Sequence, residues 1–135
     1  MYFLDTNVCV AFFRNTSEAL SRRLLACSPS KVCVPAIVEA ELLLGARKSA
    51  RVAENLAVVR SFLVPLDVVP FDRACAEQCS VVRADLEKSG AVIGPNDLMI
   101  AATVLASGGV LVTHNVAEFS RVAGLRLVDW QIADA

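Results

Sequence analysis

Four acidic residues are the side chains of this sequence best suited to carry chemistry. Asp5 follows a short apolar stretch, and Glu41 lies within an apolar helical run. Asp97 begins a later helix, and Glu118 lies beyond a polar triplet that follows an apolar strand. Carboxylates with few basic neighbours suit Mg²⁺ or Mn²⁺. Such an ion can generate a hydroxide nucleophile from bound water and stabilise the charge that develops on a scissile phosphodiester.

Each of these acids also has an ordinary structural explanation. Asp5 could cap the helix that begins near Asn7, because Asp, Thr and Asn favour helix caps and turns. Asp97 lies in a first helical turn, where the macrodipole favours an acid whatever its role. Glu118 could be a solvated surface acid. Glu41 could be an exposed helix residue, although its apolar neighbours favour burial near a partner charge. The chemical interpretation therefore rests on the four acids together.

The elements that must position these acids alternate between strands and helices, which predicts an α/β fold. A central parallel sheet covered by helices on both faces is the architecture that this alternation favours. Ligands of such sheets bind at the carboxyl ends of the strands, where Asp5 is expected to lie. The expected strands are residues 1–4, 31–34, 66–71, 110–113 and 125–128, and the expected helices are residues 8–13, 17–27, 36–49, 51–64, 72–89 and 97–107.

Composition predicts a single domain, residues 1–135, with apolar surface left for a partner. Hydrophobic residues make up 56% of the 135 residues, and the mean hydropathy is +0.56. This share exceeds the usual ~45–50% of globular domains. The formal net charge of −1 gives the whole molecule no general attraction for polyanions, so contact with nucleic acid must be local.

The same sequence predicts a cytoplasmic protein that does not enter a membrane. Five cysteines, without a C-x-x-C pair, favour a reducing compartment over a disulfide framework. The start lacks the pattern of a signal peptide, because Asp5 interrupts the apolar residues early. Residues 98–106 are the longest apolar stretch and are too short to span a bilayer, so they are expected to form a buried helix.

Short segments spread over nearly the whole chain resemble the PIN-domain ribonucleases and, within them, the VapC toxins of bacterial toxin-antitoxin pairs. They are LDTN at residues 4–7, AELLLGARKS at 40–49, NDLMIAA at 96–102, and LVTHNVAEF at 111–119 followed by GLRLVDW. The resemblance implies a PIN-like fold. It also implies endonucleolytic cleavage of RNA that depends on Mg²⁺ or Mn²⁺, by the toxin of a type II pair.

The resemblance assigns a role to each acid. Asp5, Glu41 and Asp97 match the acidic pocket of the family, with Asp5 and Asp97 expected to hold the ion. Glu41 and Glu118 are expected to shape its outer shell or to orient the attacking water. The polar residues expected to support the pocket are Thr6, Asn7, Asn96, Thr113 and Asn115.

One departure from the family pattern concerns the fourth acid. Many PIN domains carry an Asp after the fourth strand, where this chain has Asn115. An acid at the position of Glu118 is common in VapC-like sequences. Glu118 is therefore expected to complete the set, with Asn115 as its competitor for that place.

The partners that the resemblance implies are a VapB-like antitoxin, an RNA substrate and a second copy of the chain in a homodimer. RNA would need local positive charge, and Arg47, Lys48 and Arg51 follow Glu41 closely. Arg22 and Arg23 form a second basic cluster. The ordinary alternative for both clusters is a solvated helix face.

Three other functions are alternatives to the nuclease. A phosphate-receiving signalling domain would need an acid pair after the first strand and a late Lys, whereas Asp5 stands alone and the last Lys is Lys88. A Cys-His hydrolase could use Cys9 and His114, but lone cysteines in apolar runs are mostly inert core, and His114 is expected to line the pocket or bind RNA. A PIN-fold module that binds or processes RNA without a toxin role remains the alternative.

Overall fold

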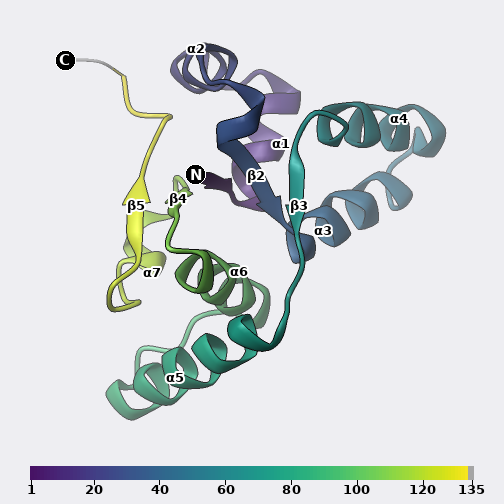
Figure 1. The fold of residues 1–135 in the computed structure, drawn as a ribbon. Coiled ribbons are helices and arrows are strands. Elements are labelled where there is room, and N and C mark those ends of the chain that lie inside the picture. Colours follow the sequence, from purple (N-terminus) through teal and green to yellow (C-terminus); the bar gives the residue numbers. More distant parts are fainter. Residues whose placement is uncertain (134–135) are drawn as a thin grey trace.

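The computed structural model describes residues 1–133, whose five strands form one sheet in the order β3-β2-β1-β4-β5 (Figure 1). Every strand pairing in it is parallel, as predicted. The carboxyl ends of the strands therefore meet at one edge of the sheet, which we call the carboxyl edge. The strands are β1 (Tyr2–Leu4), β2 (Val32–Pro35), β3 (Asp67–Val69), β4 (Val110–Val112) and β5 (Arg126–Val128).

Helices cover this sheet on opposite sides, with α1 and α2 above the strands and α5 and α6 below them in the view of Figure 1. Helix α6 packs along α5, and α3 packs along α4. The helices are α1 (Thr6–Arg14), α2 (Glu18–Ala26), α3 (Ala36–Arg47), α4 (Val52–Leu63), α5 (Arg73–Ser89), α6 (Pro95–Ser107) and α7 (Val116–Phe119), with a 3₁₀ turn at Pro29–Lys31.

The element bounds differ from the expected ones by at most two residues, mostly for reasons of capping. Asp72 precedes α5 as its N-cap, and its side chain accepts a hydrogen bond from the Cys75 N–H at 3.0 Å. Pro95 begins α6, because its fixed φ suits a first helical position. Pro70 ends β3 early. Helix α7 was not expected, because four residues are too few to show a period.

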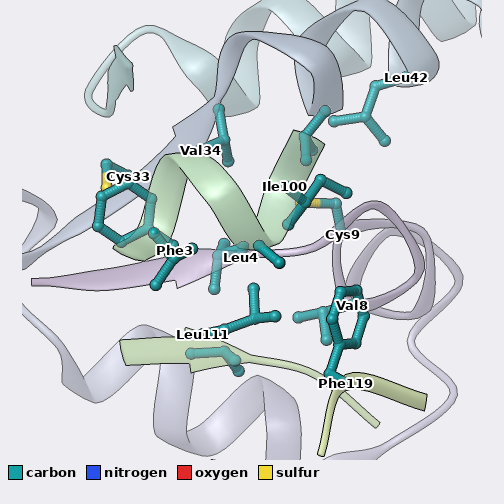
Figure 2. Close-up of a cluster of buried hydrophobic side chains, with 14 of the residues drawn as sticks. Phe3, Leu4, Val8, Cys9, Cys33, Val34, Leu42, Ile100, Leu111 and Phe119 are labelled. Atoms are coloured by element: carbon teal, nitrogen blue, oxygen red, sulfur yellow. The ribbon is translucent and has the colours of Figure 1, made fainter. Parts of the chain in front are cut away.

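The core lies between the central strands and the helices on either side (Figure 2). Phe3, Leu4 and Leu111 on the two central strands are at most 1% exposed. Most of the middle of α6 is buried, as expected for that apolar helix. All five cysteines are free, and Cys9, Cys33 and Cys75 are buried. Within residues 1–133, no helix is long and apolar enough to cross a bilayer.

The hydrogen-bond ladder of the sheet continues past the strand ends. The Asp5 N–H donates to the Val112 carbonyl at 3.3 Å, one residue beyond β1. The Thr113 N–H donates to the Val128 carbonyl at 3.0 Å, one residue beyond β4. The first residues of the carboxyl edge are therefore held by the same bonds that hold the sheet together.

Gly109 supplies a test of how tightly β4 approaches β1. A Cβ atom at this position would overlap the ring of Phe3, which is 1% exposed and cannot move aside without disturbing the core. We expect Gly109→Ala to lower the free energy of unfolding by about 1–3 kcal/mol, the usual cost of overpacking. Urea unfolding of the purified variant measures this change.

The matched control is Gly45→Ala in α3. A Cβ atom at Gly45 would meet no atom within 4 Å, and Ala is favoured over Gly inside a helix by about 1 kcal/mol. This variant should be as stable as the wild type or more so. Equal stability of the two variants would contradict the close approach of Gly109 and Phe3.

Candidate acidic site

Asp5 is both a helix cap and a member of the carboxyl edge. It directly follows β1 and is 4% exposed. Its Oδ1 accepts a hydrogen bond from the Val8 N–H at 2.8 Å, which caps the N-terminus of α1. The two interpretations of Asp5 are therefore compatible, because the cap fixes the carboxylate at the carboxyl edge of the sheet.

Burial is the main influence on the charge of Asp5 and raises the pKa of its carboxyl group. Hydrogen bonds from the Thr113 side chain and the Val8 N–H favour the ionised form and oppose this rise, while the negative charges of Glu41 and Asp129 add to it. The net pKa of Asp5 is raised. No Lys or Arg side chain forms an ion pair with Asp5 in the part of the chain that the structure describes.

Glu41 lies in the second turn of α3 and is half-buried. The Thr6 hydroxyl donates to its Oε1 at 2.6 Å. Because Thr6 is the first residue of α1, this bond joins the carboxylate of α3 to the helix that Asp5 caps. Thr6 therefore restrains the Glu41 carboxylate, and its role in a functional pocket stays a prediction.

Asp97 and Glu118 are neighbouring carboxyl groups that shift each other's pKa in opposite directions. Burial, the hydrogen bond with Glu118 and the charges of Glu118, Asp5 and Glu41 raise the pKa of Asp97 to about 7. Partial burial of Glu118 acts in the same direction, but hydrogen bonds from Asn115, Asp97 and the Gly94 N–H outweigh it and lower the pKa of Glu118. Of the two groups, Asp97 is therefore the one that takes up a proton first as the pH falls.

Asn115 and Glu118 do not compete for the fourth place in the site. The Asn115 Nδ2 donates to Glu118 Oε2 at 2.6 Å, and the Gly94 N–H donates to Oε1 at 3.3 Å. The Asn115 N–H also donates to the Thr113 hydroxyl at 3.0 Å. The Asn115 side-chain amide therefore positions the Glu118 carboxylate, which interacts with Asp97.

Two other predicted residues, Asn7 and Asn96, differ from Thr6 and Asn115 in their contacts. Asn7 is exposed in the first turn of α1, and Asn96 is half-buried in the first turn of α6. Within residues 1–133, neither side chain makes a hydrogen bond to one of the four acids. The cap of α1 and the bond to Glu41 come instead from the flanking Asp5 and Thr6.

The predicted basic residues lie at the far end of α3. Arg47 and Lys48 are exposed there, about 9 Å along the helix axis from Glu41 at the usual rise per residue. Arg51 pairs with Glu54 at 3.3 Å, and both side chains are mostly exposed. In the second cluster, Arg23 donates to the Ile132 carbonyl at 2.8 Å and so holds the C-terminal segment.

Two residues of the site were not predicted. Asp129 follows β5, and its charge contributes to the raised pKa of Asp5; the strand-end rule that selected Asp5 would also have found it. Arg121 donates to the Val92 carbonyl at 3.2 Å, and its charge helps to lower the pKa of Glu118. Arg121 follows α7, which the sequence pattern did not predict.

The structure argues against the Cys-His hydrolase. Cys9 is fully buried, and burial followed by the charge of Asp5 raises the pKa of its thiol far above the usual range. The Nδ1 of His114 binds Asp129 at 2.9 Å. A buried thiol that stays protonated is no nucleophile.

The donor set suits a hard divalent cation, although no finished coordination shell is present. Among residues 1–133, no three His, Cys, Asp or Glu side chains converge as a ready group of metal ligands. Mg²⁺ needs only one or two carboxylates and keeps several waters. The charge of Glu41 acts on both Asp5 and Asp97 and raises their pKa, so negative charge is concentrated here, which a cation would neutralise.

Comparison with known proteins agrees with this geometry. The PIN domain family model matches residues 2–125. The chain is 37% identical over 129 residues to the tRNA(fMet)-specific endonuclease VapC of Shigella flexneri, covering 96% of this chain and 97% of that one. It is 34% identical to ribonuclease VapC2 of Rickettsia felis, covering 96% and 98%.

Solved structures with the same fold are toxin-antitoxin complexes. The crystal structure of DNA-bound VapBC from Salmonella typhimurium aligns with a TM-score of 0.90 at 38% identity, covering 96% of this chain and 97% of that one. VapBC2 from Rickettsia felis, bound to a DNA fragment from their promoter, aligns at 0.89 and 34%, covering 96% and 98%. The chain therefore belongs to the PIN domain family and, within it, to the VapC ribonucleases.

Proposed function

We propose that this chain is a metal-dependent endoribonuclease and the toxin of a type II toxin-antitoxin pair. The observation that carries the proposal is the placement of Asp5, Glu41, Asp97 and Glu118 at the carboxyl edge, where the charge of Glu41 helps to raise the pKa of Asp5 and of Asp97. Similarity to proteins named endonuclease VapC and ribonuclease VapC2 supports RNA as the substrate.

Asp5 and Asp97 are the residues that would hold Mg²⁺ or Mn²⁺. When bound, the ion supplies a low-pKa water and positive charge for the phosphodiester. Asp5 is held rigidly by its cap on Val8. Because the pKa of Asp97 is raised to about 7, ionisation of this ligand is favoured as the pH rises above that value.

Glu41 and Glu118 would orient the attacking water and the outer ligands. Each is fixed by a neutral donor, Thr6 for Glu41 and Asn115 for Glu118, both at 2.6 Å. Neutral donors hold a carboxylate in place without cancelling its charge, so both groups stay available as hydrogen-bond acceptors. Arg47 and Lys48 remain predicted guides for RNA.

A VapB-like antitoxin is the partner that we propose for the apolar surface. A groove of about 360 Å³ lies between α1, α3 and α4, and its lining includes Phe13, Leu42, Val58 and Glu41. It therefore runs from the acidic site to an apolar floor. The toxin-antitoxin complexes among the similar structures support such a partner. The homodimer stays a prediction.

The central prediction concerns metal-dependent cleavage of RNA. Total RNA incubated with the purified chain should be cut in Mg²⁺ or Mn²⁺ and left intact in EDTA, with the ends mapped by sequencing. Asp5→Asn keeps a good helix cap but removes a ligand charge, and should lower the rate by more than about 100-fold, beyond the loss usual for an outer-shell partner.

The matched control is Asp85→Asn, which removes an exposed acid of α5. It should cleave at the wild-type rate. Absence of any cut that requires both metal and Asp5 would contradict the nuclease and leave the RNA-binding module without toxin role as the better reading.

A second prediction concerns the stability of the metal-free protein. A carboxyl group whose pKa is raised on folding stabilises the fold while protonated, and this contribution is lost as pH rises towards the folded pKa. For Asp97 this stabilising contribution is lost between the pKa of the group in the unfolded chain, ~3.9, and its pKa in the folded protein, about 7. In EDTA, thermal melts of the wild type should therefore shift downward from about pH 5 to about pH 8.

Asp97→Asn removes the charge that causes this loss. The variant should melt above the wild type at about pH 8 in EDTA, show less pH dependence, and cleave no RNA. Strong destabilisation at that pH would instead mean that Asp97 serves mainly as a first-turn acid for α6.

A third prediction tests whether Asn115 acts through Glu118. Asn115→Ala should lower the cleavage rate by about 10-fold to 100-fold, as loss of a second-shell partner does. Glu118→Gln should lower it at least as much. The double variant should be no slower than Glu118→Gln, because the Asn115 amide then has no carboxylate to position. Additive losses in the double variant would instead mean that Asn115 does not act through Glu118.

A further inference from the structure

His114 and Asp129 form a pair beside the acidic site that the proposed mechanism does not use. His114 Nδ1 lies 2.9 Å from Asp129 Oδ2. The two residues follow neighbouring strands, β4 and β5, at the carboxyl edge. His114 also stands between Thr113, whose side chain binds Asp5, and Asn115, which holds Glu118. The His114–Asp129 pair is therefore linked through Thr113 to Asp5 and through Asn115 to Glu118.

The surroundings of Asp129 hold the pair firmly. The Asp129 side chain is only 8% exposed, and its Oδ1 accepts the Gln131 N–H at 2.9 Å. Arg23 of α2 donates to the backbone carbonyl of Ile132 at 2.8 Å. Trp130, which lies between Asp129 and Ile132 in the sequence, is buried, and its ring centroid is 5.0 Å from that of Tyr2. The imidazole is thus oriented by an anchored carboxylate.

This anchoring selects one tautomer of the ring. An ionised carboxylate only accepts hydrogen bonds, so the hydrogen of neutral His114 resides on Nδ1 and Nε2 carries a lone pair. The His114 side chain is 63% exposed, and its Nε2 makes no hydrogen bond within residues 1–133. In the neutral form of His114, a rigidly held acceptor therefore faces solvent at the rim of the acidic site.

The backbone of a nucleic acid offers few donors to such an acceptor. Phosphate oxygens only accept hydrogen bonds, and deoxyribose has no hydroxyl within the strand. The ribose 2′-hydroxyl donates as well as accepts, and it is the group by which a protein distinguishes RNA from DNA.

We propose that His114, held by Asp129, accepts a hydrogen bond from a ribose 2′-hydroxyl of the substrate and so contributes to selection of RNA over DNA. This inference rests on the proposed nuclease function and adds a specificity residue to it. The alternative is that the pair only anchors the segment after β5.

Two substitutions separate these roles. In His114→Asn the amide nitrogen can take the place of Nδ1 and keep the bond to Asp129, but nothing replaces Nε2. In His114→Gln the longer side chain places an amide oxygen near the Nε2 position as an acceptor. Lys31→Ala is the control, because Lys31 precedes β2 at the opposite edge of the sheet.

The readout is the ratio of RNA to DNA affinity within each variant. Fluorescence anisotropy would measure binding of a labelled single-stranded RNA and of DNA of the same sequence, all in an Asp97→Asn background with Mg²⁺, so that no strand is cut. A fraction of misfolded protein lowers both affinities alike and leaves the ratio unchanged. The ratio is thus insensitive to a merely structural loss.

We expect His114→Ala and His114→Asn to lower this ratio by about threefold to tenfold, the effect of one hydrogen bond. His114→Gln should retain most of the preference, and Lys31→Ala all of it. A ratio unchanged in His114→Ala, or restored by Asn but not by Gln, would overturn the inference. So would failure of the Asp97→Asn protein to bind RNA.

Failure of the nuclease proposal would look different. Wild-type protein that binds RNA but cuts none in Mg²⁺ or Mn²⁺ would refute the proposed activity, while the affinity ratio would still decide the role of His114.

Discussion

Repulsion between carboxylates is the interaction on which the rest of this structure depends. Two such groups about 5 Å apart repel by roughly 3 kcal/mol at an effective dielectric near 20. The carboxyl edge gathers Asp5, Glu41, Asp97 and Glu118, with Asp129 close behind. The fold must hold these groups together against their charges. It does so with neutral donors and helix ends, which restrain the acids without neutralising them.

Helix N-termini provide much of this restraint. Asp5 caps α1, Asp97 lies in the first turn of α6, and Glu118 lies in α7 while it accepts the Gly94 N–H that precedes α6. Each N-terminus carries partial positive charge on its unpaired N–H groups. The parallel topology explains the arrangement, because every strand that ends at the carboxyl edge leads into a helix or turn that begins there.

The sequence predicted the fold class and the principal acids because each depends on local signals. Alternating apolar segments and turn residues are visible in one chain, and Asp5 follows directly from its place after a strand. The contacts that define roles are long-range and were not visible. Thr6 reaches Glu41 across 35 positions, and the bond between His114 and Asp129 spans two strands. The pair of Arg51 and Glu54 is local in sequence, but whether it forms depends on side-chain geometry, which the sequence does not give.

Extension of the sheet ladder to Asp5 and Thr113 has a consequence for how the acidic edge moves. Because the Asp5 and Thr113 amides bond across to neighbouring strands, the first residues of the edge cannot open separately from the central strands. Local opening would relieve the repulsion only by breaking the sheet. The electrostatic strain is therefore carried by the cooperative unit as a whole, and any cation or cationic partner that neutralises the edge tightens the entire fold.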